Sequence, residues 1–323
     1  MYWGEQSIGL VVIGKDEGER LKVCLRSAPN GVPIVYVDSG SEDGSVAFAQ
    51  SIGARILELD KDQPFTAARA RSEGFRQLLL QFPYLPFVQF VDGDCEIETD
   101  WLANGEAFLS AQGDCAAVCG RRRERYPEVS FFNRMCDEEW NTPVGDELPC
   151  GADALYRVSA FVDVGGFDPS VVAGEEPELC ARLRRAGWRI HRLDAAMTVH
   201  DANMTRTYQW WMRSVRCGFG YALVWWKTRS NGGPSIYDRQ IASALFWTLG
   251  ITALAVTLAV SAPPWALLTA PAMWTAQLVR LARRMGWRKD LHLLLGKVAE
   301  TLGALRYART VMRGREHGAI LYK

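Results

Sequence analysis

Short apolar runs alternate with helix-like segments over the first hundred residues, and this alternation constrains the fold more than any other feature. The short apolar runs are 8–13, 34–37 and 87–91, and the helix-like segments are 17–27, 44–53 and 65–80. Alternation of this kind predicts a parallel sheet covered by helices on both faces. We therefore expect an α/β fold with a Rossmann-like, mostly parallel sheet in this part of the chain.

Composition narrows the class of protein. A chain of 323 residues exceeds the usual length of one domain, so two linked units, or one large domain with an appendage, are expected. Lysine plus arginine and aspartate plus glutamate both number 37, which gives no global charge that would attract nucleic acid. The eight cysteines are scattered without a C-x-x-C pair, which favours reduced thiols over a zinc ribbon.

The C-terminal third changes character abruptly. Residues 241–260 are apolar throughout and carry no charge, which is about the length that a membrane-spanning helix needs. A second, weaker apolar run over 265–281 follows a Pro-Pro breaker and is interrupted by Pro271. The pair predicts a membrane helical hairpin, with a buried hairpin in a soluble protein as the alternative. Whether the second run crosses the bilayer stays open.

The charges that flank the two runs predict an orientation. Positive residues precede the hairpin at Lys227, Arg229 and Arg239 and follow it between Arg280 and Lys289, whereas the turn between the runs has none. The positive-inside rule then places both ends, and the N-terminal domain with them, in the cytoplasm. The C-terminal segment has leucines at helical spacing, which suits either the membrane interface or packing back on the protein.

Polar side chains follow the predicted strands. Asp92 and Asp94 come directly after the run 87–91, and residues i and i+2 at a strand end project to the same side. Two such carboxylates suit Mg²⁺ or Mn²⁺, which can bridge a diphosphate, although so short a motif also occurs in solvated turns. Asp38, after the run 34–37, and Arg71 are candidate contacts of a nucleotide.

Six motifs, in order, resemble those of family 2 glycosyltransferases of the GT-A fold. The resemblance covers roughly residues 8–221. The motifs are VVIGKDE at 11–17, VDSGSEDG at 37–44, ARSEG at 70–74, DGD at 92–94, VGGFD at 164–168 and GEEPEL at 174–179. Their common order and spacing make the set far more specific than any one of them.

The resemblance implies transfer of a sugar from a nucleotide diphosphate sugar, such as a UDP- or GDP-sugar, to an acceptor hydroxyl. Glu17, Asp38 and Arg71 would hold the nucleoside, Asp92 would lie near the ribose and the metal, and Asp94 would bind Mn²⁺ or Mg²⁺ directly. The metal would stabilise the departing diphosphate as a Lewis acid.

The resemblance also implies an inverting mechanism with a carboxylate base. The family has aspartate at the position of Glu176, so either Glu176 or Glu175 is the base. We favour Glu176, with Glu175 orienting the acceptor.

Three further residues are candidates. His200 ends a strand-like run and is a candidate third metal ligand, with a structural role as the alternative. Arg213 and Arg216 lie in a segment that does not match the Q-x-x-R-W spacing of processive synthases. These two arginines either clamp a diphosphate or lie against lipid headgroups.

The expected organisation has four segments. They are a nucleotide-sugar-binding half of a GT-A domain over 1–100, an acceptor and catalytic half over 101–239, a membrane hairpin over 240–284 and an amphipathic segment over 285–323. We expect an enzyme at the inner or plasma membrane that contacts membrane lipid, acts on a saccharide or lipid-linked acceptor and has no nucleic-acid partner. The alternatives are an inert GT-A-like membrane binding subunit and, less favoured, a sugar nucleotidyltransferase.

Overall fold

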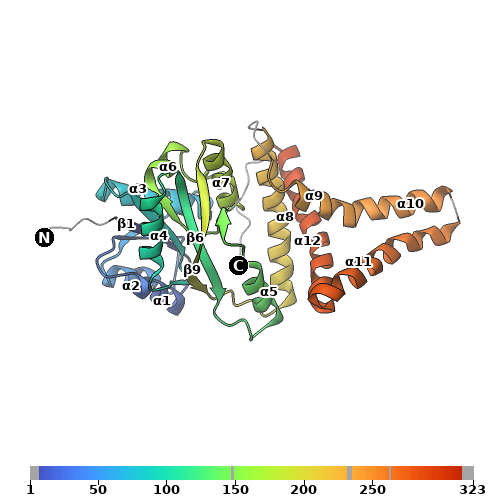
Figure 1. Ribbon diagram of the computed structural model, residues 1–323, viewed down its shortest axis with the longest axis horizontal. Helices are drawn as coiled ribbons and strands as arrows, with labels where there is room; N and C mark the ends of the chain where they lie inside the picture. Colours follow the sequence, from blue (N-terminus) through green and yellow to red (C-terminus); the bar gives the residue numbers. More distant parts are fainter. Residues whose placement is uncertain (1–6, 147–148, 231–234, 262, 315–323) are drawn as a thin grey trace. The chain divides into compact units, whose positions relative to one another are not determined.

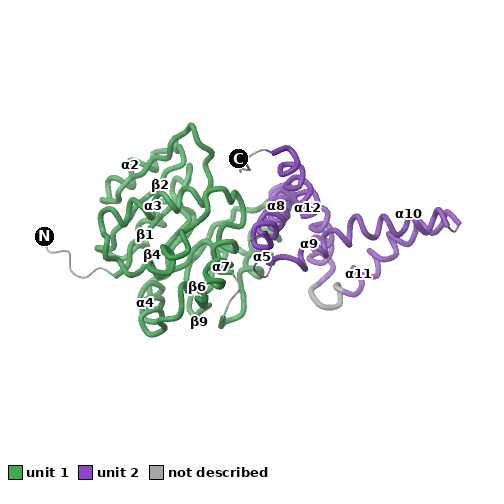
Figure 2. The backbone as a smooth tube through the Cα atoms, turned by 90° about the horizontal axis from the view of Figure 1, so that it is seen from above, with its two compact units in different colours: residues 1–205, 317–323 green, residues 206–316 purple. Residues whose placement is uncertain are grey.

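The computed structural model describes residues 7–146, 149–230, 235–261 and 263–314. The chain divides into two compact units, residues 1–205 with 317–323 and residues 206–316 (Figure 2). The described residues of the first unit form an α/β sheet domain, and those of the second form helices only. The four functional segments expected from the sequence remain a prediction, because these units are defined by packing.

The first half of the sheet follows the predicted alternation. Its elements are β1 (Ile8–Gly14), α1 (Glu19–Ser27), β2 (Ile34–Asp38), α2 (Ser45–Ser51), β3 (Arg55–Glu58), α3 (Ala67–Gln81) and β4 (Phe87–Asp92). Strands β1, β2, β3 and β4 pair in parallel, in the order β3-β2-β1-β4. Strand β3 is not in the predicted alternation, because at the edge of the sheet none of its residues is fully buried and it carries no long apolar run.

The second half makes the sheet mixed. Its elements are β5 (Cys95–Ile97), α4 (Trp101–Ala111), β6 (Cys115–Glu124), α5 (Phe131–Glu139), β7 (Gly145–Asp146), β8 (Leu155–Arg157), α6 (Val158–Asp163), α7 (Glu175–Arg185) and β9 (Arg189–His200). Strand β8 joins β4 to β6 and is antiparallel to both, and β9 is parallel to β6. Among the described residues the sheet has nine strands, with β5 and β7 each antiparallel to β9.

Helices cover both faces of the sheet, as predicted (Figure 1). Successive residues of a strand point to opposite faces. On β4, Phe90 contacts Phe75 of α3, whereas its neighbour Gln89 accepts a hydrogen bond from Trp101 of α4. Helix α3 lies so close to the sheet that a Cβ on Gly74 would clash with Val11.

The strand directions bring several chain segments to one edge. Strands β1, β2 and β4 are parallel, and β6 and β9 run the same way because β8 is antiparallel to both β4 and β6. Their carboxyl ends therefore lie at the same edge of the sheet, which is where ligands bind in open α/β sheets. Asp38, Asp92, Glu124 and His200 are the last residues of four of these strands.

The second unit is helical. It consists of α8 (Thr207–Ser230), α9 (Asp238–Leu245), a π-helical turn (Phe246–Gly250), α10 (Ile251–Ser261), a 3-10 helix (Pro264–Leu268), α11 (Thr269–Met285) and α12 (Trp287–Met312). Helices α10 and α11 contact each other and extend away from α8 and α12 (Figure 1).

Helix α12 packs against α8 through small residues. A Cβ on Gly303 would lie 2.0 Å from the backbone oxygen of Val215, and one on Gly218 would lie 2.0 Å from that of Glu300. Both positions therefore require glycine, which lets the two helices approach closely. Of the two alternatives for the C-terminal segment, the described part of α12 packs back on the protein. Of its leucine stripe Leu294 is buried, whereas Leu295, Leu302 and Leu305 are exposed. Residues 315–323 of that segment lie outside the described residues.

One helix in the described part of the chain is long and apolar enough to cross a membrane. It spans Asp238–Ser261, has a mean hydropathy of 1.9 over its most apolar window, and only 17% of that window is buried. The second run of the predicted hairpin does not qualify. Pro271, Gln277 and Arg280 lie within α11, and polar groups lower the hydropathy of that helix.

Candidate active site

The turn after β4 places two carboxylates at the edge of the sheet. Asp92 ends β4, and its backbone N–H donates to the buried carboxylate of Asp153 at 3.1 Å. The N–H of Gly93 donates to the backbone oxygen of Ile13 at 2.8 Å, which fixes the turn against β1. A Cβ at Gly93 would be tight against that oxygen, so the glycine permits the close approach.

Asp94 and His200 lie together, as the sequence suggests for two metal ligands. The pairing of β5 with β9 brings them together, because Cys95, the residue after Asp94, lies opposite His200. The Oδ2 atom of Asp94 is 3.2 Å from Nε2 of His200, and the other ring nitrogen is 3.8 Å from a carboxylate oxygen of Glu124. Imidazole held between two carboxylates is a common arrangement in metal sites.

Burial and charge act in opposite directions on this pair. Burial favours a higher pKa for Asp94, but its hydrogen bond to His200 and the positive charges nearby bring the pKa well below the ordinary value. Burial and Arg122 favour a lower pKa for His200, but the carboxylates of Asp94 and Glu124 raise it. Asp94 is therefore an ionised carboxylate at neutral pH.

The donor set at this turn suits a hard divalent cation. Side-chain atoms of Asp94, Cys95 and His200 lie within 4.8 Å of one another, as do those of Asp92, Cys95 and Asp153. Burial raises the pKa of the Cys95 thiol well above its ordinary value, so the sulfur stays protonated and is a poor ligand. Carboxylate oxygens and one imidazole nitrogen remain, which fits Mn²⁺ or Mg²⁺.

A second pair of carboxylates opens helix α7. Gly174 precedes the helix with a φ of 82°, a left-handed conformation that glycine adopts without strain. Glu175 and Glu176 occupy the first turn, where negative charge is favourable near the helix N-terminus. Glu178 does not join them, because both of its oxygens bind the guanidinium of Arg182 on the same helix.

Arg71 connects the two carboxylate groups. Its side chain is only 2% exposed, and Nη2 donates to Asp92 at 2.7 Å. Its Nη1 atom donates to Glu175 at 2.9 Å and to Glu176 at 3.0 Å. The sequence predicts a nucleotide contact for Arg71, whereas here its guanidinium binds carboxylates from β4 and α7, so its first effect is to position them.

Glu176 has the environment of a base that works near neutral pH. Burial, together with the adjacent Glu175, raises its pKa to about 7, although Arg71 acts in the other direction. Its side chain is 14% exposed and that of Glu175 is 6% exposed, so Glu176 is the more accessible of the two. A general base is most effective when its pKa lies near the working pH.

The other predicted nucleotide contacts shape the neighbouring loops. Asp38 is buried and accepts hydrogen bonds from the hydroxyl of Tyr36 and from the backbone N–H groups of Gly40 and Ser41, so it folds the loop after β2. Glu17, after β1, lies 2.5 Å from the guanidinium of Arg20. Arg213 and Arg216 belong to α8 in the second unit, and their roles stay predictions.

Three residues at this edge are missing from the sequence prediction. Arg122 lies 3.6 Å from Asp92 and 3.5 Å from Asp153, and its guanidinium stacks over Trp140 at 5.0 Å. Arg122 and Glu124 lie near the end of β6, so the rule that identifies Asp92 would find them once β6 is recognised as a strand. Asp153 precedes the antiparallel strand β8, which no local sequence signal reveals.

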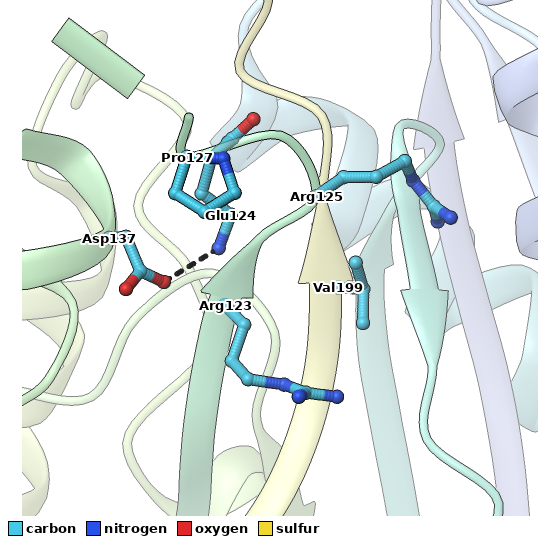
Figure 3. A pocket seen from close by; sticks show the side chains of 6 residues that line it. All are labelled: Arg123, Glu124, Arg125, Pro127, Asp137 and Val199. Atoms are coloured by element: carbon cyan, nitrogen blue, oxygen red, sulfur yellow. Dashed lines mark hydrogen bonds between the residues drawn. The ribbon is translucent and has the colours of Figure 1, made fainter. Parts of the chain in front are cut away.

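A surface pocket of about 430 Å³ lies where β6 and β9 end (Figure 3). Its lining residues come from both strands, from the segment after β6 and from helix α5: Arg123, Glu124, Arg125, Pro127, Asp137 and Val199. Arg123 pairs with Glu98 and Arg125 pairs with Glu96, both on or next to β5. The charges that line this pocket are therefore largely balanced.

Comparison with known proteins gives a family for part of the chain. Residues 10–156 match the family described as Glycosyl transferase family 2. The succinoglycan biosynthesis protein ExoA of Rhizobium meliloti is 28% identical over 191 residues, which cover 56% of this chain and 57% of ExoA. The glycosyltransferase AglE of Haloferax volcanii is 22% identical over 257 residues, covering 75% of this chain and 80% of AglE.

A solved structure has the same fold. The mannosyltransferase PcManGT of Pyrobaculum calidifontis, solved in complex with GDP-Man and Mn²⁺, superimposes with a TM-score of 0.60. At 18% identity it covers 94% of this chain, and this chain covers 88% of it. The sheet, the motifs and these matches lead to one assignment: residues 10–156 belong to glycosyltransferase family 2, and the chain is an enzyme with the GT-A fold.

Proposed function

We propose that this enzyme transfers one sugar, with inversion, from a nucleotide diphosphate sugar to the hydroxyl of a lipid-linked saccharide acceptor at the membrane. The observation that carries the proposal is the pairing of Asp92 with Glu175 and Glu176 through Arg71. This contact holds the predicted metal motif and the predicted base next to each other. A donor bound at the metal motif would then present its anomeric carbon to the base side of the site.

The metal chemistry rests on Asp94 and His200, with Asp92 beside them. These residues supply the hard oxygen and nitrogen atoms that Mn²⁺ and Mg²⁺ prefer. When bound there, the cation would neutralise the developing charge of the nucleoside diphosphate leaving group. A carboxylate oxygen of Glu124 lies 3.8 Å from the second ring nitrogen of His200, on the side away from Asp94.

Glu176 is the proposed base. Its carboxylate accepts the proton of the acceptor hydroxyl as that oxygen bonds to the anomeric carbon. The bond between the anomeric carbon and the diphosphate oxygen breaks in the same displacement, so the anomeric configuration inverts. Arg71 holds Glu176 in place at 3.0 Å, and Glu175 shares the same guanidinium nitrogen.

The donor pocket would be formed by the loops after β1 and β2. Asp38 fixes the loop at 39–41 by accepting hydrogen bonds from two backbone N–H groups, and Glu17 lies in the loop after β1. We expect the nucleoside to lie along these loops. Arg213 and Arg216 are proposed to contact either the diphosphate or lipid headgroups.

The apolar helix Asp238–Ser261 supports the membrane location. Most of its surface is exposed, which is unfavourable in water and favourable in a bilayer. With basic residues on both flanks, we propose that the sheet domain faces the cytoplasm, where nucleotide sugars are available. A membrane-bound enzyme and a lipid-linked acceptor would diffuse in the same membrane, which would bring the acceptor to the active site.

Turnover of radiolabelled donor sugars into lipid-extractable product by membranes that contain the enzyme tests this function. Transfer by the wild type and not by Asp94→Ala supports it. A folded wild type that binds donors and transfers nothing favours the inert binding subunit. Release of pyrophosphate from a nucleoside triphosphate and a sugar phosphate favours the nucleotidyltransferase.

A further inference from the structure

Two cysteines lie side by side on the helix that carries Glu176. The Sγ atom of Cys180, on α7, is 3.4 Å from the Sγ atom of Cys150, in the segment before β8. The backbone N–H of Cys150 also points at the sulfur of Cys180, at 3.5 Å. The hydroxyl of Tyr156 lies 3.0 Å from the sulfur of Cys150.

We propose that Cys150 and Cys180 form a redox-sensitive dithiol, which a hydroperoxide converts to a disulfide that clamps the start of α7. All eight cysteines lie in the described part of the chain, and none of them is in a disulfide there. The site is separate from the metal motif and uses residues that the transfer reaction does not need.

The chemistry balances with hydrogen peroxide as the oxidant. The sulfur of Cys180 attacks one peroxide oxygen, the O–O bond breaks, and hydroxide leaves and becomes water, which gives a sulfenic acid. The sulfur of Cys150 then attacks the sulfur of the sulfenic acid, an S–S bond forms, and a second water leaves. Two thiols are oxidised by two electrons, and one peroxide is reduced to two waters.

The surroundings favour Cys180 as the attacking thiol. Burial favours a higher pKa for this thiol, but hydrogen bonds from the side chain and the backbone of Cys150, together with the charge of Arg184, lower the pKa below its ordinary value. The hydrogen bond with Cys180, together with burial, raises the pKa of Cys150 well above its ordinary value. The thiolate is the reactive form, so the pair has one nucleophile and one resolving thiol.

The geometry permits the bond with a small movement. A disulfide requires about 2.05 Å between the sulfurs, so the two must approach by a little over 1 Å from their present distance. Both sulfurs are buried, with Cys180 0% and Cys150 3% exposed, so peroxide must reach them through a local opening, for which the segment before β8 with its exposed Gly151 is the nearest surface in sequence.

The clamp would act on the active site through α7. Cys180 lies one helical turn after Glu176, so the two side chains share a face of the helix. Movement of α7 toward Cys150 would draw Glu176 away from Arg71, and active sites lose rate steeply when a reacting group shifts by about 1 Å. This effect on activity rests on the proposed function, whereas disulfide formation does not.

Peptide mapping tests the disulfide directly. The full chain in detergent is treated with hydrogen peroxide, remaining thiols are alkylated, and peptides are mapped by mass spectrometry without reduction. We expect a linked pair of peptides that contain Cys150 and Cys180, which disappears after dithiothreitol and in both Cys180→Ser and Cys150→Ala. Cys115→Ser is the matched control, because Cys115 is also buried but donates to the backbone oxygen of Ala117; it should keep the link.

Three outcomes would overturn the proposal. In the first, Cys150 and Cys180 are both fully alkylated when protein that was folded during the peroxide treatment is unfolded for mapping. In the second, the link uses Cys119 instead. In the third, one cysteine alone is oxidised to a sulfinic acid. A melting curve for each variant confirms that it is folded.

A second experiment measures activity. Peroxide should lower sugar transfer by the wild type at least about tenfold, dithiothreitol should restore it, and transfer by Cys180→Ser should be unaffected by peroxide. A disulfide without loss of transfer would refute the clamp on α7, whereas an untreated wild type without transfer would count against the proposed function alone.

Discussion

Asp94, in the turn after β4, and Glu176, in the first turn of α7, are carboxylates of one site. Their pKa values are shifted in opposite directions. The pKa of Asp94 is held well below its ordinary value, because His200 and nearby positive charges outweigh burial. Burial and Glu175 raise the pKa of Glu176 to about 7. A group that stays ionised suits a cation ligand, and a group that titrates near neutral pH suits proton transfer. The difference supports the proposed roles, with Asp94 as a cation ligand and Glu176 as the base.

The largest expected effect comes from removing the proposed base, Glu176. Glu176→Gln keeps the size of the side chain and removes its ability to take a proton, so kcat should fall by about 10²- to 10⁴-fold. Steady-state transfer assays measure this, and donor affinity should change little. Glu175→Gln is the matched control and should lose less activity. An equal or larger loss in Glu175→Gln would reverse the assignment of the base.

Removing the metal ligand should cost nearly as much. Asp94→Asn retains the shape but not the charge, and loss of transition-state charge stabilisation should lower kcat by about 10²- to 10³-fold. In contrast to the previous variant, the dependence on Mn²⁺ concentration should also weaken. Asp114→Asn, which changes an exposed aspartate paired with Arg189, should be close to wild type. Full Mn²⁺ dependence in Asp94→Asn would contradict the assignment.

His200 should matter for metal affinity more than for the chemical step. His200→Ala should weaken Mn²⁺ activation by about 10- to 100-fold in concentration, with a smaller change in kcat at saturating metal. His191→Ala is the control on the same strand, where His191 stacks on Phe108 instead. A metal requirement unchanged in His200→Ala would leave the histidine with a structural role only.

The pH dependence of the rate should sharpen the comparison further. Because Glu176 must be deprotonated to act as a base, kcat should rise with pH through about 7 and level off above it. The groups that face Glu176 include Arg71, Glu175, Asp92 and Tyr156, and Arg71 is the one that lowers its pKa. Arg71→Gln should therefore raise the pKa of Glu176 and move the rise of kcat to higher pH.

A buried arginine on the same helix provides the control for that shift. Arg69 pairs with Glu73 away from the site, so Arg69→Gln should leave the pH profile in place. The profile is measured over pH 5 to 9 at saturating donor and metal. If Arg71→Gln lowers the rate without moving the rise of kcat, Arg71 does not tune the base and its contact with Glu176 is structural.

The sequence predicts the parallel half of the sheet well and the mixed half poorly. Strands β1, β2 and β4 are buried on both faces and therefore appear as continuous apolar runs. Strand β8 has only three residues, and its place between β4 and β6 depends on contacts distant in sequence. Asp153, which precedes β8, is missed for the same reason.

Sequence motifs identify the site residues but not how they pair. Asp92, Asp94, Glu176 and His200 were all candidates from the sequence, and the structure brings them to one edge of the sheet. The contacts of Arg71 with Glu175 and Glu176 join residues more than 100 positions apart, and no local pattern predicts them. The same holds for Gly303, which by its propensity weakens a helix and in the fold permits the contact of α12 with α8.

Ligand-induced thermal stabilisation tests the division of roles most directly. Binding to the native state raises the melting temperature, so GDP, UDP and their sugars are compared with and without Mn²⁺ on the full chain in detergent. The account predicts a Mn²⁺-dependent rise for at least one nucleotide in the wild type, retained in Glu176→Gln and lost in Asp94→Ala. A rise of equal size in Asp94→Ala, or no rise with any nucleotide in folded wild type, would contradict it.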